Sequence, residues 1–156
     1  MTIFEDKLKA YIALKKIDAE HLTFHESCHS VEEAAKAVGT TPDAFVKNIC
    51  LVDPAGRLIV AILKGEDRLD LKTLGRELGG LALRMARADE VLEKTGYPAG
   101  GVPSFGYEAV FMIDERVMAR DVVYSGGGSE YALVKISTQQ LLNANNGRVA
   151  ALSKKL

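Results

Sequence analysis

The sequence predicts a single α/β domain of the α+β kind, in which helices flank a mixed, partly closed, barrel-like β-sheet. A length of 156 residues fits one domain with a sizeable core. Strand and helix patterns are interspersed without the regular βαβ rhythm of a doubly wound fold. Two neighbouring segments, 45–53 and 57–64, are largely apolar on both faces, which is typical of strands inside a sheet. We therefore expect residues 1–156 to form one domain, with the helix at 2–16 and the tail at 145–156 at its periphery.

The first third of the chain carries clear signals for two helices and a strand. Apolar residues on one side of residues 2–16 predict a helix, and a short apolar run predicts a strand at 22–26. Ser30 begins the next helix as a capping box with Glu33, and Gly39 ends it.

Turn and capping residues define the elements that follow. The segment 53–56, Asp-Pro-Ala-Gly, is a β-turn sequence that joins the two apolar strands into a pair. Asp70 is placed to cap a helix that Gly79 and Gly80 end. Similar patterns predict helices at 89–95 and 137–142 and strands at 81–86, 109–114 and 131–136. The tail after residue 145 is expected to be loosely held.

Composition excludes several classes of protein. The apolar fraction is 47% and the charged fraction 26%, and no apolar run is long enough to span a membrane. The formal net charge of −1 argues against a large surface that tracks phosphates, although a local basic pocket is permitted. No signal peptide is visible, and the two cysteines do not suggest a disulfide framework. We therefore expect a cytoplasmic protein with neither a membrane nor DNA as its partner.

Lys47 is the unusual residue of the first apolar strand. Alternation along a strand places it on one face with Phe45, Ile49 and Leu51. An unpaired ammonium among apolar neighbours is costly, so Lys47 pairs with a carboxylate or a ligand phosphate, or its pKa falls. Such a lysine is a candidate functional group. The alternative is a side chain that reaches solvent at the end of the sheet or holds a structural ion pair.

Two glycine-rich segments are candidate ligand loops. The loop at 96–106 contains four glycines and two prolines, and it can present backbone N–H groups to an oxyanion or a phosphate. The alternative is a long surface connection that needs several special backbone angles. The segment 126–128 is Gly-Gly-Gly, but it lacks the context of a dinucleotide fingerprint or a phosphate loop and favours a hairpin connection.

The sequence offers little for metal or covalent chemistry. His25, Cys28 and His29 lie close together, but the second ligand pair that a structural zinc site needs is missing. We therefore expect no metal and no cofactor, and we place His29 at the entry to the helix that Ser30 caps. Because no Gly-x-Ser-x-Gly elbow is present, a hydrolase of this sequence would use water or the substrate itself to supply the attacking oxygen.

An ordered set of segments resembles the YbaK-like family of aminoacyl-tRNA deacylases, which includes the editing domain inserted in bacterial-type prolyl-tRNA synthetases. The matching pieces cover most of residues 20–142, and they lie at 28–35, 45–52, 70–74, 95–96 with 100–106, 110–114 and 125–126. The resemblance implies a barrel-like mixed sheet and a free-standing enzyme that hydrolyses the ester of a misacylated tRNA in trans. It points to tRNA(Pro) carrying a small non-cognate amino acid.

The resemblance also implies roles for individual residues. The family's essential lysine falls on Lys47, and its glycine-rich active-site loop includes Gly100 and Gly101, whose N–H groups would hold the carbonyl oxygen while water attacks. The substrate-binding residues that the resemblance implies are Val102, Pro103, Ser104, Phe105, Gly106, His29, Ser125 and Gly126. One departure concerns the loop, where members often carry proline at the position of Ser104 and this chain has proline one residue earlier.

The expected partners are the acceptor end of an aminoacyl-tRNA and an aminoacyl-tRNA synthetase. Two other functions stay open at this point. One is a non-catalytic module of the same fold that binds a tRNA end or a synthetase. The other is a nucleotide-binding protein that uses the glycine loops as a phosphate cradle.

Overall fold

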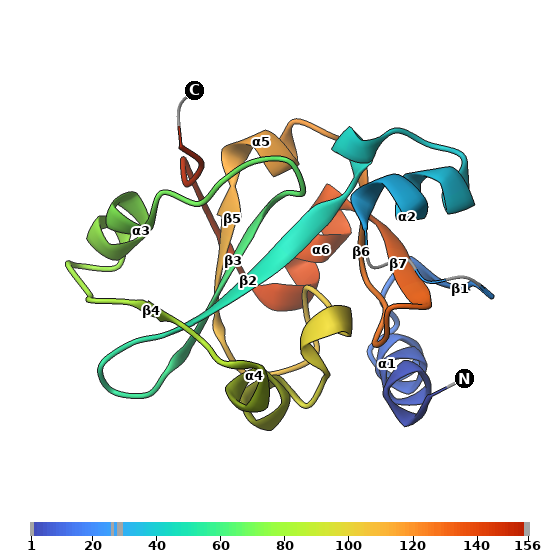
Figure 1. Cartoon of the computed structure of the whole chain (residues 1–156), viewed down its shortest axis with the longest axis horizontal. Helices are drawn as coiled ribbons and strands as arrows, with labels where there is room; N and C mark the ends of the chain where they lie inside the picture. The colour runs from blue at the N-terminus through green and yellow to red at the C-terminus, as the bar shows by residue number, and fades with distance from the viewer. Residues whose placement is uncertain (1, 26, 28–29, 155–156) are drawn as a thin grey trace.

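Two β-sheets form the framework of the computed structural model, which describes residues 2–25, 27 and 30–154 (Figure 1). The larger sheet has the strand order β4-β2-β3-β5-β8 and the smaller one β1-β7-β6. The larger sheet contains β2 (Val46–Val52), β3 (Leu58–Lys64), β4 (Arg84–Met85), β5 (Val110–Asp114) and β8 (Arg148–Ala150). The smaller sheet contains β1 (Ala19–Thr23), β6 (Val122–Gly126) and β7 (Ala132–Ser137).

Helices surround these sheets, and local capping explains where several of them begin. The helices are α1 (Ile3–Leu14), α2 (Val31–Val38), α3 (Leu71–Glu77), α4 (Ala88–Thr95), α5 (Glu115–Met118) and α6 (Thr138–Asn145). Two short 3-10 turns are η1 (Pro42–Ala44) and η2 (Ala99–Gly101). The Ser30 hydroxyl accepts from the Glu33 N–H at 3.1 Å, and Gly39 ends α2 with φ +70°. None of the described helices is long and apolar enough to cross a membrane.

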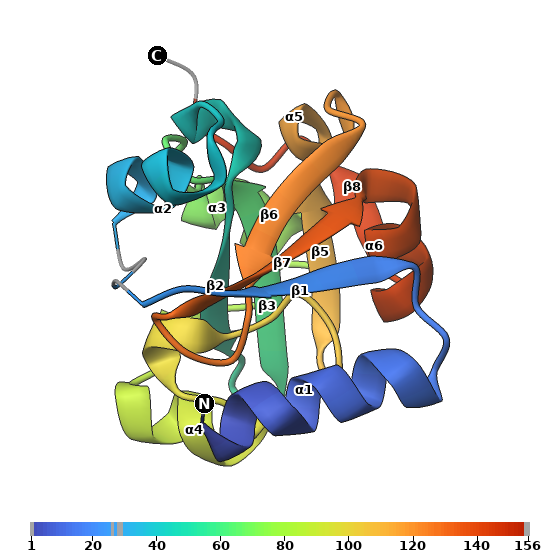
Figure 2. The same cartoon turned by 90° about the vertical axis from the view of Figure 1, so that its right-hand side faces the viewer.

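The antiparallel pair of β2 and β3 is the centre of the larger sheet. Its turn follows the predicted sequence, because the Gly56 N–H donates to the Asp53 carbonyl at 3.0 Å. β3 is buried along nearly its whole length, between β2 and the parallel strand β5. Just before β2, Phe45 bridges to Tyr124 of β6, so the two sheets meet along this line. Figure 2 shows the smaller sheet crossing in front of the larger one. The two sheets are joined along this line and do not close into a complete barrel. The predicted fold class, a mixed and only partly closed sheet with flanking helices, is therefore confirmed.

Tertiary contacts correct four details of the sequence prediction. The strand expected at 22–26 begins earlier and is β1, because it pairs antiparallel with β7. The strand expected at 81–86 contains only the two residues of β4. Residues 148–150 form β8 beside β5, and the buried Leu152 donates its N–H to Asp114 at 2.8 Å. The prediction of a loosely held tail is therefore wrong.

The fourth correction concerns α1, which we expected at the periphery. Its Leu8 is fully buried in the main core cluster, and its Glu5 is also buried. Figure 2 shows α1 running along the base of both sheets. Burial of a leucine contributes about 1.5–3 kcal/mol. The helix is therefore part of the packed core.

Candidate functional site

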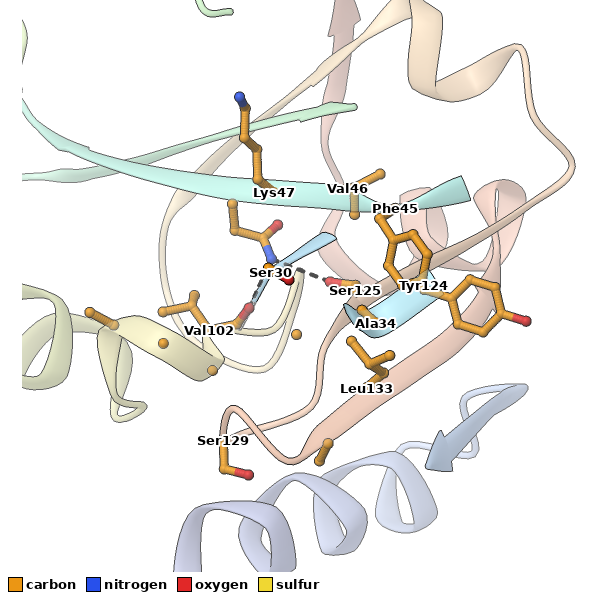
Figure 3. Close-up of a pocket in the computed structure, with 16 residues that line it drawn as sticks. Ser30, Ala34, Phe45, Val46, Lys47, Val102, Tyr124, Ser125, Ser129 and Leu133 are labelled. Atoms are coloured by element: carbon orange, nitrogen blue, oxygen red, sulfur yellow. Dashed lines mark hydrogen bonds between the residues drawn. The ribbon is translucent and has the colours of Figure 1, made fainter. Parts of the chain in front are cut away.

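A cavity of about 290 Å³ lies where β2, η2, α2 and the β6–β7 hairpin meet (Figure 3). It opens beside the line where the two sheets join. Its lining consists of small, apolar and hydroxyl side chains together with Asn48 and Lys47. The lining residues are Ser30, Ala34, Phe45, Val46, Lys47, Asn48, Ala99, Gly100, Gly101, Val102, Tyr124, Ser125, Gly126, Ser129, Ala132 and Leu133.

The two glycine-rich segments, far apart in the sequence, pack against each other at this cavity. The Gly128 N–H donates to the Gly101 carbonyl at 2.8 Å. A Cβ atom on Gly101 would lie 2.3 Å from the backbone nitrogen of Ser129, and one on Gly126 would lie 2.1 Å from the Val102 carbonyl oxygen. Both glycines are therefore required by close backbone contact. Gly100 differs, since a Cβ there would meet no atom within 4 Å.

The backbone of residues 101–104 is fixed by side chains and backbone from four other parts of the chain. Each of the four successive carbonyl groups accepts a hydrogen bond. The donors are the Gly128 N–H to Gly101 at 2.8 Å, Asn48 Nδ2 to Val102 at 2.8 Å, the Tyr107 hydroxyl to Pro103 at 2.7 Å and Asn145 Nδ2 to Ser104 at 3.0 Å. The loop is therefore held in one conformation before any ligand binds, as a preorganised site requires.

The half-buried Asn48 and the buried Ser104 and Ser125 form a ring of hydrogen bonds. The Ser104 hydroxyl donates to Asn48 Oδ1 at 2.7 Å, and the oxygens of Ser104 and Ser125 are 2.6 Å apart. A serine has one proton to donate, so the Ser125 hydroxyl must donate to Ser104. Asn48 Nδ2 donates to Ser125 at 3.3 Å and closes the ring. Each hydroxyl proton is used, and neither serine has a base beside it in this ring. The ring therefore holds the loop and does not resemble an activated nucleophile.

Lys47 projects from β2 on the side opposite to Val102 and Ser125 (Figure 3). Its stem borders the cavity, and its ammonium donates to the Gly65 carbonyl at 3.2 Å. Among the described residues, no carboxylate lies within 4 Å of this ammonium. A half-buried cation with only a carbonyl partner there is available to an anionic group of a ligand.

An aromatic pair forms the apolar wall of the cavity. The rings of Phe45 and Tyr124 stack with centroids 5.1 Å apart and an angle of 25° between their planes. Ala34 and Leu133 continue this wall, and Phe45, Ala34 and Leu133 are buried. A rigid wall of this kind limits the size of a bound side chain.

Ser129 connects the cavity to a buried carboxylate on α1. Its hydroxyl donates to Glu5 Oε2 at 2.7 Å and accepts from the Tyr131 N–H at 3.0 Å. Burial raises the pKa of Glu5, but hydrogen bonds from Ser129 and Thr2 outweigh this effect and leave the pKa below its ordinary value. Glu5 is therefore ionised at neutral pH.

The structure brings most, but not all, of the predicted site residues together. Lys47, Gly100, Gly101, Val102, Ser104, Ser125 and Gly126 line the cavity or form its polar ring. Phe105 is fully buried away from the lining and stacks on Tyr11, and Gly106 lies beside the same tyrosine with φ +99°. Pro103 contributes through its carbonyl, which Tyr107 holds. His29 lies outside the described residues.

Sequence reasoning missed Asn48, Phe45, Tyr124 and Ser129 as site residues. Only Asn48 carried a signal, as a polar side chain on the other face of an apolar strand from Lys47. The aromatic pair and Ser129 could not be found in this way, because they join the site through contacts between distant segments.

Metal and thiol chemistry find no support in the described part of the chain. No group of three or more His, Cys, Asp or Glu residues there could hold a metal ion. Cys28 lies outside that part. Burial raises the pKa of the Cys50 thiol to about 11, so it stays protonated at neutral pH and is a poor nucleophile.

Several known proteins are similar to this chain in sequence or in fold. Prolyl-tRNA editing protein ProX of Acetoanaerobium sticklandii is 27% identical over 75% of this chain and 76% of its own. EbsC of Enterococcus faecalis, proposed to be a Cys-tRNA(Pro)/Cys-tRNA(Cys) deacylase, is 23% identical over 81% of this chain and 78% of its own. A crystal structure of a proposed trans-editing enzyme for prolyl tRNA synthetase matches with a TM-score of 0.92, 28% identity and coverage of 99% of both chains. The model of the aminoacyl-tRNA editing domain matches residues 25–144, and the chain belongs to this family.

Proposed function

We propose that this chain is an aminoacyl-tRNA deacylase that hydrolyses the ester of a misacylated tRNA in trans. The observation that carries the proposal is the fixed segment 101–104, whose four carbonyls are held before a ligand arrives. The names of the similar proteins support the same reaction. Because aminoacyl-tRNA is used in translation, the cytoplasm is the compartment that we propose.

Gly100 is the residue that we propose to stabilise the reacting carbonyl. The Gly101 N–H donates to the Pro98 carbonyl at 2.9 Å, so it is not free for a ligand. The first N–H groups of a helical turn have no acceptor within the turn, and in η2 Gly100 provides one of these groups. Its surroundings are open. An N–H group held there would stabilise the negative charge that develops on the ester carbonyl oxygen.

Water is the nucleophile in this proposal, and a hydroxyl group of the substrate assists it. Ser104 and Ser125 use their protons within the ring with Asn48, and the Cys50 thiol is buried and protonated. Lys47 would bind a phosphate of the terminal nucleotide. The attack breaks the bond between the acyl carbon and the ribose oxygen and releases the amino acid and the tRNA.

We propose a small non-cognate amino acid on tRNA(Pro) as the substrate. The cavity of about 290 Å³ is closed on one side by the aromatic pair and the buried Ala34 and Leu133. A rigid apolar wall excludes larger side chains better than smaller ones. The proposed link to prolyl-tRNA rests on the names of ProX and of the trans-editing enzyme, and an association with a synthetase belongs to the same proposal.

A panel of tRNAs charged with cysteine, alanine, serine, threonine or proline tests the function. Release of the amino acid is measured with and without the protein, and the spontaneous rate is subtracted. We expect rapid hydrolysis for one or two small amino acids. A protein that accelerates none of the five reactions is not a deacylase of this class. Saturable binding of free adenosine nucleotides without hydrolysis would instead support a nucleotide-binding protein.

A further inference from the structure

We propose that Ser129, together with Glu5 behind it, binds the free α-ammonium group of the aminoacyl substrate. The inference rests on the proposed deacylase function and adds a recognition site to it. The ligand class is a primary ammonium next to an ester carbonyl.

The contacts of Ser129 leave one acceptor position for a ligand. A serine oxygen donates one hydrogen bond and accepts two. Ser129 donates to Glu5 Oε2 at 2.7 Å and accepts one bond from the Tyr131 N–H at 3.0 Å. Its second lone pair has no protein donor among the described hydrogen bonds. Since Ser129 lines the cavity, this lone pair is available to a donor such as an ammonium group.

Glu5 supplies the negative charge that a bound ammonium needs. Among the residues that the structure describes, none that lines the cavity is acidic, and Lys47 is the only charged one. Glu5 is 3% exposed, and its carboxylate is joined to the lining through the Ser129 hydroxyl. A buried carboxylate acts through a medium of lower dielectric constant than water, so its attraction for a cation one hydrogen bond away is strengthened. The hydrogen bond that Ser129 gives to Glu5 also makes the serine oxygen a better acceptor.

The positions of Ser129 and Lys47 give the substrate one direction in the cavity. The two residues lie on opposite sides of it, Lys47 on β2 and Ser129 on the β6–β7 hairpin next to α1 (Figure 3). The ammonium would lie at Ser129, and a phosphate would lie at Lys47. Gly100 of η2 also lines the cavity, and we place the ester carbonyl at its N–H group. A substrate without the ammonium would lose one of the two charged contacts that set this direction.

The first experiment changes the substrate and needs no mutant protein. The amino acid that the panel identifies is attached to tRNA, and a second tRNA carries its α-hydroxy analogue, in which a hydroxyl of nearly the same size replaces the ammonium. Each enzymatic kcat/KM is divided by the spontaneous hydrolysis rate of the same ester. We expect the normalised value to fall roughly ten- to a hundredfold for the hydroxy ester, as for loss of a charged hydrogen bond. Equal values for both esters would overturn the inference and leave the deacylase function intact.

The second experiment tests whether Ser129 and Glu5 cause this preference. Ser129→Ala and Glu5→Gln should lower hydrolysis of the aminoacyl ester and leave hydrolysis of the hydroxy ester nearly unchanged. Lys47→Ala should lower both reactions, because both esters carry the same phosphates. Glu20→Gln, which removes an exposed carboxylate on β1, is the matched control and should change neither.

The alternative is that the Glu5–Ser129 pair only attaches α1 to the hairpin. In that case, both variants would lower the rates for the two esters by the same factor, and the inference would be wrong. Should Glu5→Gln fail to fold, Ser129→Ala and the substrate comparison still decide the question. A protein that hydrolyses neither ester and no member of the panel refutes the proposed function itself.

Discussion

The ammonium of Lys47 makes one hydrogen bond among the described residues, to the Gly65 carbonyl. Replacing it with alanine removes the cation and leaves an apolar strand. We expect Lys47→Ala to keep the fold and lose most of the deacylase activity, and Lys47→Arg to be impaired because a planar guanidinium does not replace a compact ammonium. The measurements are initial rates and thermal unfolding, with the exposed Lys72→Ala as control. Activity of Lys47→Ala close to that of the wild type would exclude Lys47 from the mechanism.

Gly100 and Gly101 are adjacent, yet the structure gives them different roles. An added methyl at Gly101 meets the backbone of Ser129 at 2.3 Å, whereas one at Gly100 meets no atom within 4 Å. We expect Gly101→Ala to lower the free energy of unfolding by about 1–3 kcal/mol through overpacking. Gly100→Ala should leave stability unchanged and reduce kcat, since its methyl group enters the cavity. Urea unfolding and single-turnover rates measure the two effects, and a reversed pattern would contradict this arrangement of the loop.

The ring of Asn48, Ser104 and Ser125 should behave as one unit. Ser104→Ala leaves Oδ1 of the half-buried Asn48 without its donor, and loss of this hydrogen bond costs about 0.5–1.5 kcal/mol. Ser125→Ala breaks the same ring. We expect the double variant to be less destabilised than the sum of the single variants, because either change already opens the ring. Chemical unfolding of the four proteins gives the coupling energy. If the losses in unfolding free energy of the two single variants add up to that of the double variant, the ring is not cooperative.

At the scale of elements, α4 is tied to β4 by an ion pair with a defined pH dependence. The two terminal guanidinium nitrogens of Arg84 each donate to Glu90 at 2.8 Å, and the Arg87 backbone N–H donates to the same carboxylate at 3.0 Å. The hydrogen bonds from Arg84, followed by the one from Arg87, lower the pKa of Glu90 to about 2.

This pKa predicts how the stability of α4 changes with acid. A depressed pKa means that the contribution of Glu90 is complete above the ordinary glutamate value near 4.5 and is lost as the pH falls towards about 2. We expect Glu90→Gln to be less stable than the wild type at pH 6 and to approach it at pH 2. Urea unfolding at both pH values measures this difference. If the stability difference between Glu90→Gln and the wild type is the same at pH 6 and pH 2, Glu90 contributes no ionic stabilisation.

α1 contributes more to the core and to the site than its sequence predicts. It lies outside the residues that the family model matches, yet it contributes Leu8 to the core, Tyr11 to the stack on Phe105 and Glu5 to Ser129. We expect Leu8→Ala to cost about 2–5 kcal/mol, as for other buried leucines. Thermal unfolding measures the loss, with the exposed Leu14→Ala as a control that should be nearly neutral.

At the scale of the whole molecule, the charges favour recognition of the acceptor end alone. The 20 Lys and Arg residues are balanced by 21 Asp and Glu. Three cations that could contact phosphates are already paired, since Arg84 and Arg87 contact Glu90 and Lys64 lies 3.5 Å from Glu66. With a formal net charge of −1, the molecule has no general excess of cations for distant phosphates.

The consequence is a weak salt dependence. Each neutralised phosphate adds about 0.7–0.9 to the slope of log affinity against log salt. We expect the slope of only a few contacts, and we expect an acceptor-stem minihelix to be hydrolysed nearly as well as full tRNA. Rates on both substrates across a salt series measure this. A minihelix that is inert beside an active full-length tRNA would show that distant contacts matter.

The sequence by itself determined the local elements and the family. Capping by Ser30 and Asp70, the turn at 53–56 and the apolar pair of strands depend on short-range backbone chemistry, and the structure has each of them. The fold class followed from the same patterns, because mixed signals without a βαβ rhythm exclude a doubly wound sheet. Lys47 and the glycine loop were also visible, since an ammonium in an apolar strand and clustered glycines are unusual locally.

Only the tertiary structure decided how these parts meet. The contact between Gly101 and the β6–β7 hairpin, the ring of Asn48 with two distant serines and the carboxylate of Glu5 behind Ser129 join segments that are far apart in the chain. Burial of α1 and addition of β8 to the sheet depend on the same long-range packing. Patterns of short period report which face of an element is apolar. They carry no information about which other element covers that face, and the shape of the cavity depends on that choice.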